Sequence, residues 1–101
     1  MSAVDDLRRN YRAAFLRHLA RPREESPLHA GYELGRSALA AGVGLLDVVR
    51  VHHDVLVGVL RGGPAEEAPG VAEAASDFLL EVLSSYDMSQ RRAATLREGP
   101  R

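Results

Sequence analysis

Apolar residues recur at intervals of three and four along four stretches of the chain, and no stretch alternates with a period of two. The first spacing is typical of a helix with one face in a core, whereas alternation is typical of a strand. The pattern predicts helices over about 4–20, from Pro27 to about Gly42, over about 45–61 and over about 71–97. Short connections favour antiparallel neighbours. We therefore predict an all-α, up-and-down four-helix bundle with a long C-terminal helix, or a dimer of such hairpins.

Residues that start and stop helices mark the boundaries of these segments. Ser26 is a good N-cap, and Pro27 suits the first helical position because its missing N–H is not needed there. Gly42 is a plausible stop for the second helix. Residues 62–70, with two prolines, separate the third and fourth helices. Gly31 and Gly35 share a face of the second helix, where they allow a neighbouring helix to approach closely.

The third predicted helix is apolar over more than half of its circumference. We interpret it either as the central helix of the bundle or as a helix that packs on both its own domain and a partner. Its inner face is predicted to hold Leu45, Val48, Val49, His52, Val55, Leu56, Val59 and Leu60, with Val51 and Val57 partly outside it. This excess of apolar surface, with the length of the fourth helix, predicts a homodimer.

The length and composition of the chain argue against several classes of function. With 101 residues and 46% hydrophobic residues, the chain is expected to form one domain over 1–98 with a tail at 99–101. A net charge of −1 argues against nucleic-acid binding, and no apolar run is long enough to span a membrane. Without cysteine there is no disulfide or thiolate chemistry. Because the N-terminus lacks signal-peptide features, we expect a cytoplasmic protein.

The histidines are the first candidates for chemistry. His52 and His53 are adjacent, so their side chains diverge by about 100° on a helix and do not suit one metal ion. A phosphoacceptor role for His53 remains a remote alternative. We therefore predict no catalytic residue, no metal site and no cofactor. His52 lies within the apolar face and is predicted to be a buried structural imidazole that donates to a carbonyl or carboxylate, and Phe78 and Tyr86 are predicted to be structural core residues.

Residues along all four predicted helices match one known pattern, most specifically in the fourth helix. The matching residues are Tyr11, Leu16, Ser26, Leu28, Arg36, His52, Val55, Leu56, the segment Asp77-Phe78-Leu79-Leu80-Glu81-Val82-Leu83, Tyr86, Met88 and Thr95-Leu96-Arg97. In these residues the chain resembles the N-terminal domain of RsbU-type phosphatases, which regulate stress sigma factors in bacteria. The phosphatase domain itself is absent from these residues.

The resemblance implies a four-helix domain that dimerises, docks a switch-kinase-like activator of the RsbT type, and passes the signal down its last helix. The implied docking positions are His29, Leu80 and Ser84, of which only Leu80 keeps the expected aliphatic character; an aromatic is usual at His29 and an aliphatic at Ser84. Spacing adds Asp87 and Arg91, since Leu80, Ser84, Asp87 and Arg91 follow one another at intervals of four, three and four.

These features predict a regulatory protein-interaction domain that binds itself and a partner protein in stress signalling. The alternative from another class is a sensory bundle that binds a small apolar ligand near Tyr32, His52 and Tyr86.

Overall fold

The computed structural model describes residues 2–21 and 25–98, and for residues 25–27, 97 and 98 it describes the backbone alone. The tail predicted at 99–101 lies outside these ranges. The described residues form four α-helices and one short 3₁₀ turn, which confirms the all-α class and the number of helices. The elements are α1 (Ala3–Ala20), α2 (Glu25–Ala40), α3 (Leu45–Gly62), η1 (Ala65–Glu67) and α4 (Ala68–Glu98).

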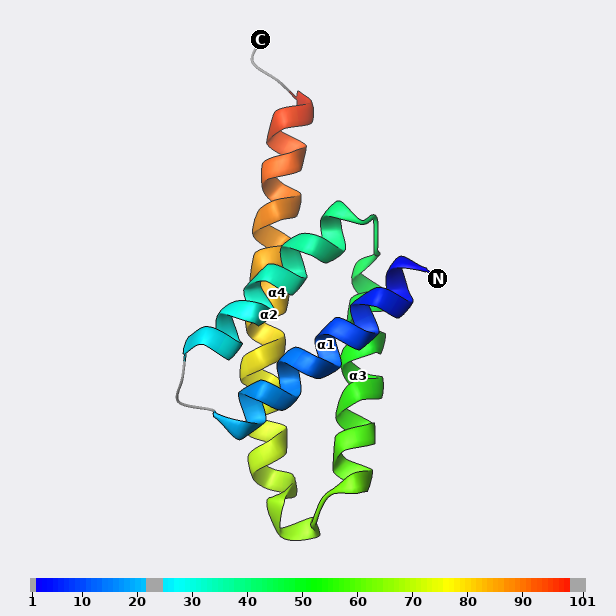
Figure 1. Cartoon of the computed structure of the whole chain (residues 1–101). Coiled ribbons are helices and arrows are strands. Elements are labelled where there is room, and N and C mark those ends of the chain that lie inside the picture. Colours follow the sequence, from blue (N-terminus) through cyan, green and yellow to red (C-terminus); the bar gives the residue numbers. More distant parts are fainter. Residues whose placement is uncertain (1, 22–24, 99–101) are drawn as a thin grey trace.

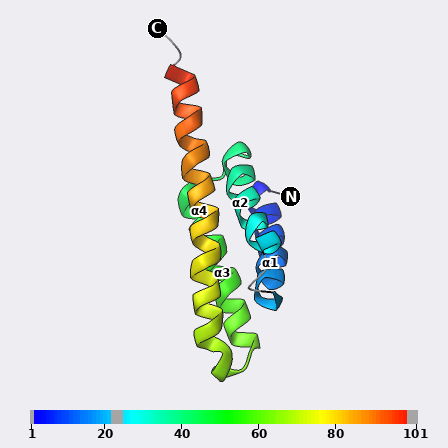
Figure 2. The ribbon, with the colours of Figure 1, turned by 90° about the vertical axis from the view of Figure 1, so that its left-hand side faces the viewer.

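The helices form two antiparallel hairpins stacked as two layers (Figures 1 and 2). Helices α1 and α2 make one layer, and they lie obliquely across the α3–α4 layer rather than alongside it. Between the two layers, α1 packs mainly on α3, and α2 packs mainly on α4. The arrangement therefore differs from a bundle of four nearly parallel helices. Its smallest dimension, 17 Å, corresponds to two layers of helices.

Two helix boundaries differ from the sequence prediction. Helix α2 begins at Glu25, two residues before Pro27, so Ser26 lies inside the helix and is not its N-cap; the side chain of Ser26 lies outside the described part of the chain. Helix α4 begins at Ala68 instead of residue 71, because Pro69 in a first turn needs no backbone donor. The predicted stop at Gly42 holds, since its φ of 76° is a conformation that favours glycine.

The core lies where α1 crosses the other hairpin. Tyr11 and Phe15 of α1 pack against Phe78 of α4, with ring centroids 5.1 and 5.6 Å from that of Phe78. Such edge and tilted contacts add to the free energy gained by burying the rings. The other buried apolar residues surround this cluster: Leu7, Ala14, Ala38, Val43, Val48, Val51, Val55, Ala75, Val82 and Tyr86.

Two glycines bring α2 into close contact with α4, as their spacing predicts. A Cβ on Gly31 would lie 3.2 Å from the Phe78 ring. A Cβ on Gly35 would overlap the Ser85 hydroxyl oxygen and the backbone carbonyl oxygen of Val82. The absence of side chains at these two positions therefore sets the distance between the two layers.

The buried face of α3 is rotated from the predicted one. Val48, Val51 and Val55 are buried beneath α1, although Val51 was expected to lie partly outside the face. Leu45, Val49 and Leu60 were predicted to be inside but are exposed. The reason is that α3 forms an edge of a two-layer fold, so only one of its two apolar sides is covered by α1.

Candidate partner-binding surface

Four of the predicted binding residues form one exposed stripe along α4. Leu80 is 64% exposed, and Ser84, Asp87 and Arg91 follow it on the same side of the helix. Leu80 is rotated by about 160–200° from Phe78 and Val82, whose side chains face the α1–α2 layer. The stripe therefore lies on the side of α4 that points away from that layer.

Past Leu80, the stripe continues along α4 with two charged residues, Asp87 and Arg91. Asp87 and Arg91 form an ion pair of 3.1 Å between Oδ2 and Nε, and both side chains are exposed. An ion pair this exposed adds little to folding stability. Asp87 and Arg91 can therefore leave this ion pair and bind a partner with little loss of folding free energy.

His29, the fifth predicted binding residue, lies on α2 and apart from this stripe. Its Nε2 atom is 3.6 Å from the carboxylate of Glu33, and its ring stacks on Tyr32 with a centroid distance of 5.9 Å. Helix α2 contacts α4 at Val82 and Ser85, on the other side of α4 from Leu80. Within the described residues, no hydrogen bond or ion pair joins His29 to the α4 stripe. A partner would have to reach around the edge of the molecule to touch both.

His52 has a partner of a different kind from the one predicted. It is only half-buried, and its Nδ1 atom is 2.7 Å from the hydroxyl oxygen of Tyr11. Burial lowers the pKa of His52 below its ordinary value, and the neighbouring charge of His53 adds to the effect. Burial raises the pKa of Tyr11, so its hydroxyl keeps its proton. With the imidazole neutral and its proton on Nε2, the Tyr11 hydroxyl donates to Nδ1. The contact joins α1 to α3, and the carbonyl or carboxylate expected from the sequence is not the partner.

Phe78 and Tyr86, the other residues predicted to be structural, are both buried. The Tyr86 hydroxyl donates a hydrogen bond of 2.8 Å to the backbone carbonyl of Val43, in the connection between α2 and α3. This bond satisfies a polar atom that is removed from water, and it anchors the connection to α4. His18 is also buried, against Phe78, and neither of its ring nitrogens has a hydrogen-bond partner among the described residues.

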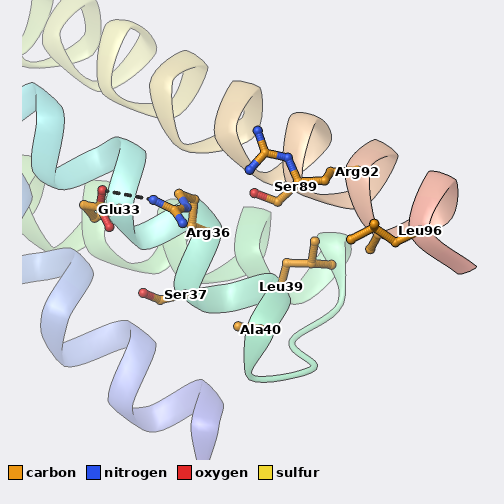
Figure 3. A pocket seen from close by; sticks show the side chains of 9 residues that line it. Glu33, Arg36, Ser37, Leu39, Ala40, Ser89, Arg92 and Leu96 are labelled. Carbon is orange, nitrogen blue, oxygen red and sulfur yellow. Dashed lines mark ion pairs between the residues drawn. The ribbon is translucent and has the colours of Figure 1, made fainter.

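A groove that the sequence does not predict lies between the end of α2 and the C-terminal end of α4 (Figure 3). The groove is open and holds about 490 Å³. Arg36 of α2 pairs with Glu33 across 3.7 Å, and Arg92 of α4 lies on the opposite wall. Its lining combines these charges with small and aliphatic side chains: Glu33, Arg36, Ser37, Leu39, Ala40, Ser89, Arg92, Ala93 and Leu96. No sequence motif marks it, because its two walls lie about fifty residues apart in the chain.

In residues 2–21 and 25–98, no three His, Asp or Glu side chains are grouped so that they could hold a metal ion. None of the helices in these ranges combines the length and the apolar character needed to cross a bilayer.

Comparison with known proteins identifies the family. The family model for the N-terminal domain of the phosphoserine phosphatase RsbU matches the sequence over residues 9–89, which is more than half of the chain. This chain belongs to the RsbU N-terminal domain family. Neither the curated proteins nor the solved structures yield a match. The RsbU N-terminal domain is a regulatory part of its phosphatase and not the catalytic part, so the four helices described above form a regulatory domain. The match begins at residue 9, within α1, and extends over α2, α3 and the α4 stripe as far as Asp87.

Proposed function

We propose that this RsbU-type domain is a cytoplasmic protein-interaction module in stress sigma-factor signalling. In this proposal it forms a homodimer and docks a switch-kinase-like protein of the RsbT type. The docking surface is centred on Leu80 and Ser84, with Asp87 and Arg91 beside them, and a partner that reaches around the edge of the molecule also contacts His29.

The observation that carries the proposal is the exposed leucine on the fourth helix. Leu80 contributes almost nothing to the core because 64% of it is exposed. An exposed leucine is unremarkable by itself. Here it follows the family pattern of α4, and an exposed ion pair lies further along the same stripe. An apolar residue with polar groups beside it suits a transient interface.

The shape of α4 supports a route for the signal. This helix has 31 residues, against 16 to 18 for the other three, and its C-terminal end projects past them (Figure 1). A partner on the Leu80 stripe would contact the part of α4 that is packed on α2 at Gly35. A small change in that packing would change the direction of the projecting part, because a continuous helix moves as a rigid rod.

Replacement of Leu80 by arginine tests the docking surface. Burying a leucine at an interface contributes about 1.5–3 kcal/mol, and the guanidinium introduced by Leu80→Arg would also have to be desolvated. We expect the affinity for an RsbT-type switch kinase, measured by isothermal titration calorimetry, to fall by more than about tenfold. The helical circular dichroism and the melting temperature should stay nearly unchanged.

Leu96→Arg is the matched control, since Leu96 is a 74% exposed leucine on the same helix and lies outside the stripe. It should bind the switch kinase as the wild type does. Two results would contradict the proposal: unchanged binding by Leu80→Arg, or a Leu80→Arg variant that unfolds or becomes monomeric. In the second case Leu80 would belong to the core or to a dimer contact.

No observation favours the small-ligand sensor as a second function. The three residues that suggested it have separate partners: Tyr32 stacks on His29, His52 bonds Tyr11, and Tyr86 bonds Val43.

A further inference from the structure

Helix α3 has a second apolar side, which the fold leaves uncovered. Leu46 is 79% exposed, and Val49 and Leu60 are also exposed. With His53 and the half-buried Leu56, these residues recur at intervals of three, four, three and four. This is the spacing with which one helix packs along another. We call the five residues the outer face of α3.

The outer face points away from α1. Leu46 is rotated by about 140–180° from Val51 and Val55, which are buried beneath α1. Among the described elements, none lies over this side of the α3–α4 layer (Figure 2). The outer face carries no Asp, Glu or Arg; its one polar residue is His53, at its centre.

We propose that the outer face of α3 is covered by the same face of a second copy, with the two α3 helices antiparallel about a twofold axis near His53. This inference rests on the homodimer of the proposed function and names the surface that forms it. In this arrangement Leu46 lies against Leu60 of the second copy, and Val49 lies against Leu56. A twofold contact requires each patch to match itself, and the near-symmetric spacing around His53 satisfies that requirement.

The charges beside the outer face select the antiparallel direction. Along one flank of α3 the charged residues are Asp47, Arg50, Asp54 and Arg61, in that order. Antiparallel alignment about His53 sets Asp47 beside Arg61 of the second copy, and Arg50 beside Asp54. Parallel alignment would instead place this charged flank on opposite sides of the two α3 helices, so these ion pairs could not form. Asp54 also lies 3.5 Å from Arg8 of α1, and both side chains are about half exposed, so this contact leaves the carboxylate accessible.

A leucine-to-glutamate change on the outer face tests the surface. Leu46→Glu should convert the dimer to monomer in a sedimentation dilution series that reaches about 100 µM, a range that detects micromolar dimers. The fold should tolerate it because Leu46 is exposed and lies in the first turn of α3, where an acidic side chain is favoured. Leu96→Glu is the control with similar exposure, and it should remain dimeric.

A charge exchange tests the direction. Asp47→Arg and Arg61→Asp should each weaken the dimer by about two- to tenfold, because each creates two like-charge contacts across the dimer in place of two ion pairs. The double variant restores opposite charges and should return to within about twofold of the wild-type dissociation constant. If neither single change altered the dissociation constant, the antiparallel contact would be wrong.

The outcomes separate this surface from the proposed function. A wild-type dimer that persists in Leu46→Glu overturns the outer face and leaves the homodimer in place. A wild-type chain that stays monomeric throughout the series removes both the homodimer and this surface. Leu80 lies on the neighbouring helix of the same layer, so switch-kinase binding is measured in parallel. Loss of binding in Leu80→Arg with an intact dimer supports a docking stripe distinct from the outer face.

Discussion

The contact between α2 and α4 makes a sharp prediction about Gly35. Alanine at this position would set its methyl group into the Ser85 hydroxyl oxygen and the Val82 carbonyl oxygen, and 3.0 Å from the Tyr86 backbone nitrogen. A flexible side chain could turn aside, but a helix backbone cannot, so the two layers must move apart. Because Ser85 also donates its hydroxyl to the Val82 carbonyl at 3.1 Å, that local bond would be disturbed as well.

The magnitude follows from two opposing effects. Alanine is favoured over glycine in a helix by up to about 1 kcal/mol. Overpacking of a close contact costs about 1–3 kcal/mol, and rigid backbone on one side places Gly35→Ala at the upper end. The net loss is therefore about 2 kcal/mol, which corresponds to a fall of about 8–16 °C in the melting temperature of a domain of this size.

Gly58→Ala is the matched control for thermal melting followed by circular dichroism. Gly58 is also a helical glycine, but a Cβ added to it would meet no heavy atom within 4 Å outside its own helix backbone. This variant should melt at the wild-type temperature or a few degrees above it. All variants are compared at one protein concentration, since self-association raises the melting temperature. If Gly35→Ala melted at or above the wild-type temperature, the close contact between α2 and α4 would not exist as described.

Two further predictions concern polar contacts between helices. The pKa of His52 is lowered in the folded state, so as the pH falls the unfolded chain takes up a proton on this residue first, near pH 6.5. The stability that neutral His52 contributes is therefore complete above about pH 6.5 and is lost as the pH falls below that value. The melting temperature of the wild type should therefore fall more between about pH 8 and pH 5.5 than that of His52→Gln, and an equal fall in both would refute the role of His52. Tyr86→Phe should destabilise the fold by about 1–3 kcal/mol in urea unfolding, because the buried carbonyl of Val43 loses its donor. Tyr32→Phe, which removes a hydroxyl from a half-buried ring, should have a much smaller effect, and similar losses in the two variants would contradict this role for Tyr86.

Much of the candidate surface could be predicted from the sequence because it depends on helical geometry alone. Once residues 77–91 are helical, Leu80, Ser84, Asp87 and Arg91 must lie on one side, and Phe78 and Val82 on another. The position of His29 relative to this stripe could not be predicted in the same way. It depends on how α2 crosses α4, and that crossing is set by contacts between residues about fifty positions apart, such as Gly35 and Ser85.

The sequence by itself determined the four helices, their approximate ends and the family, because periodicity, capping residues and turn glycines act between neighbours in the chain. It also indicated that α3 has more apolar surface than one core requires. Only the tertiary structure decided which side of α3 is buried, because the answer depends on where α1 lies. Val48, Val51 and Val55 are covered by α1, whereas Leu46 and Leu60 are exposed. The hydrogen-bond partner of His52 was likewise decided by the tertiary structure. Tyr11 is 41 positions away in the chain, and the crossing of the two layers brings its hydroxyl oxygen within 2.7 Å of the His52 Nδ1 atom.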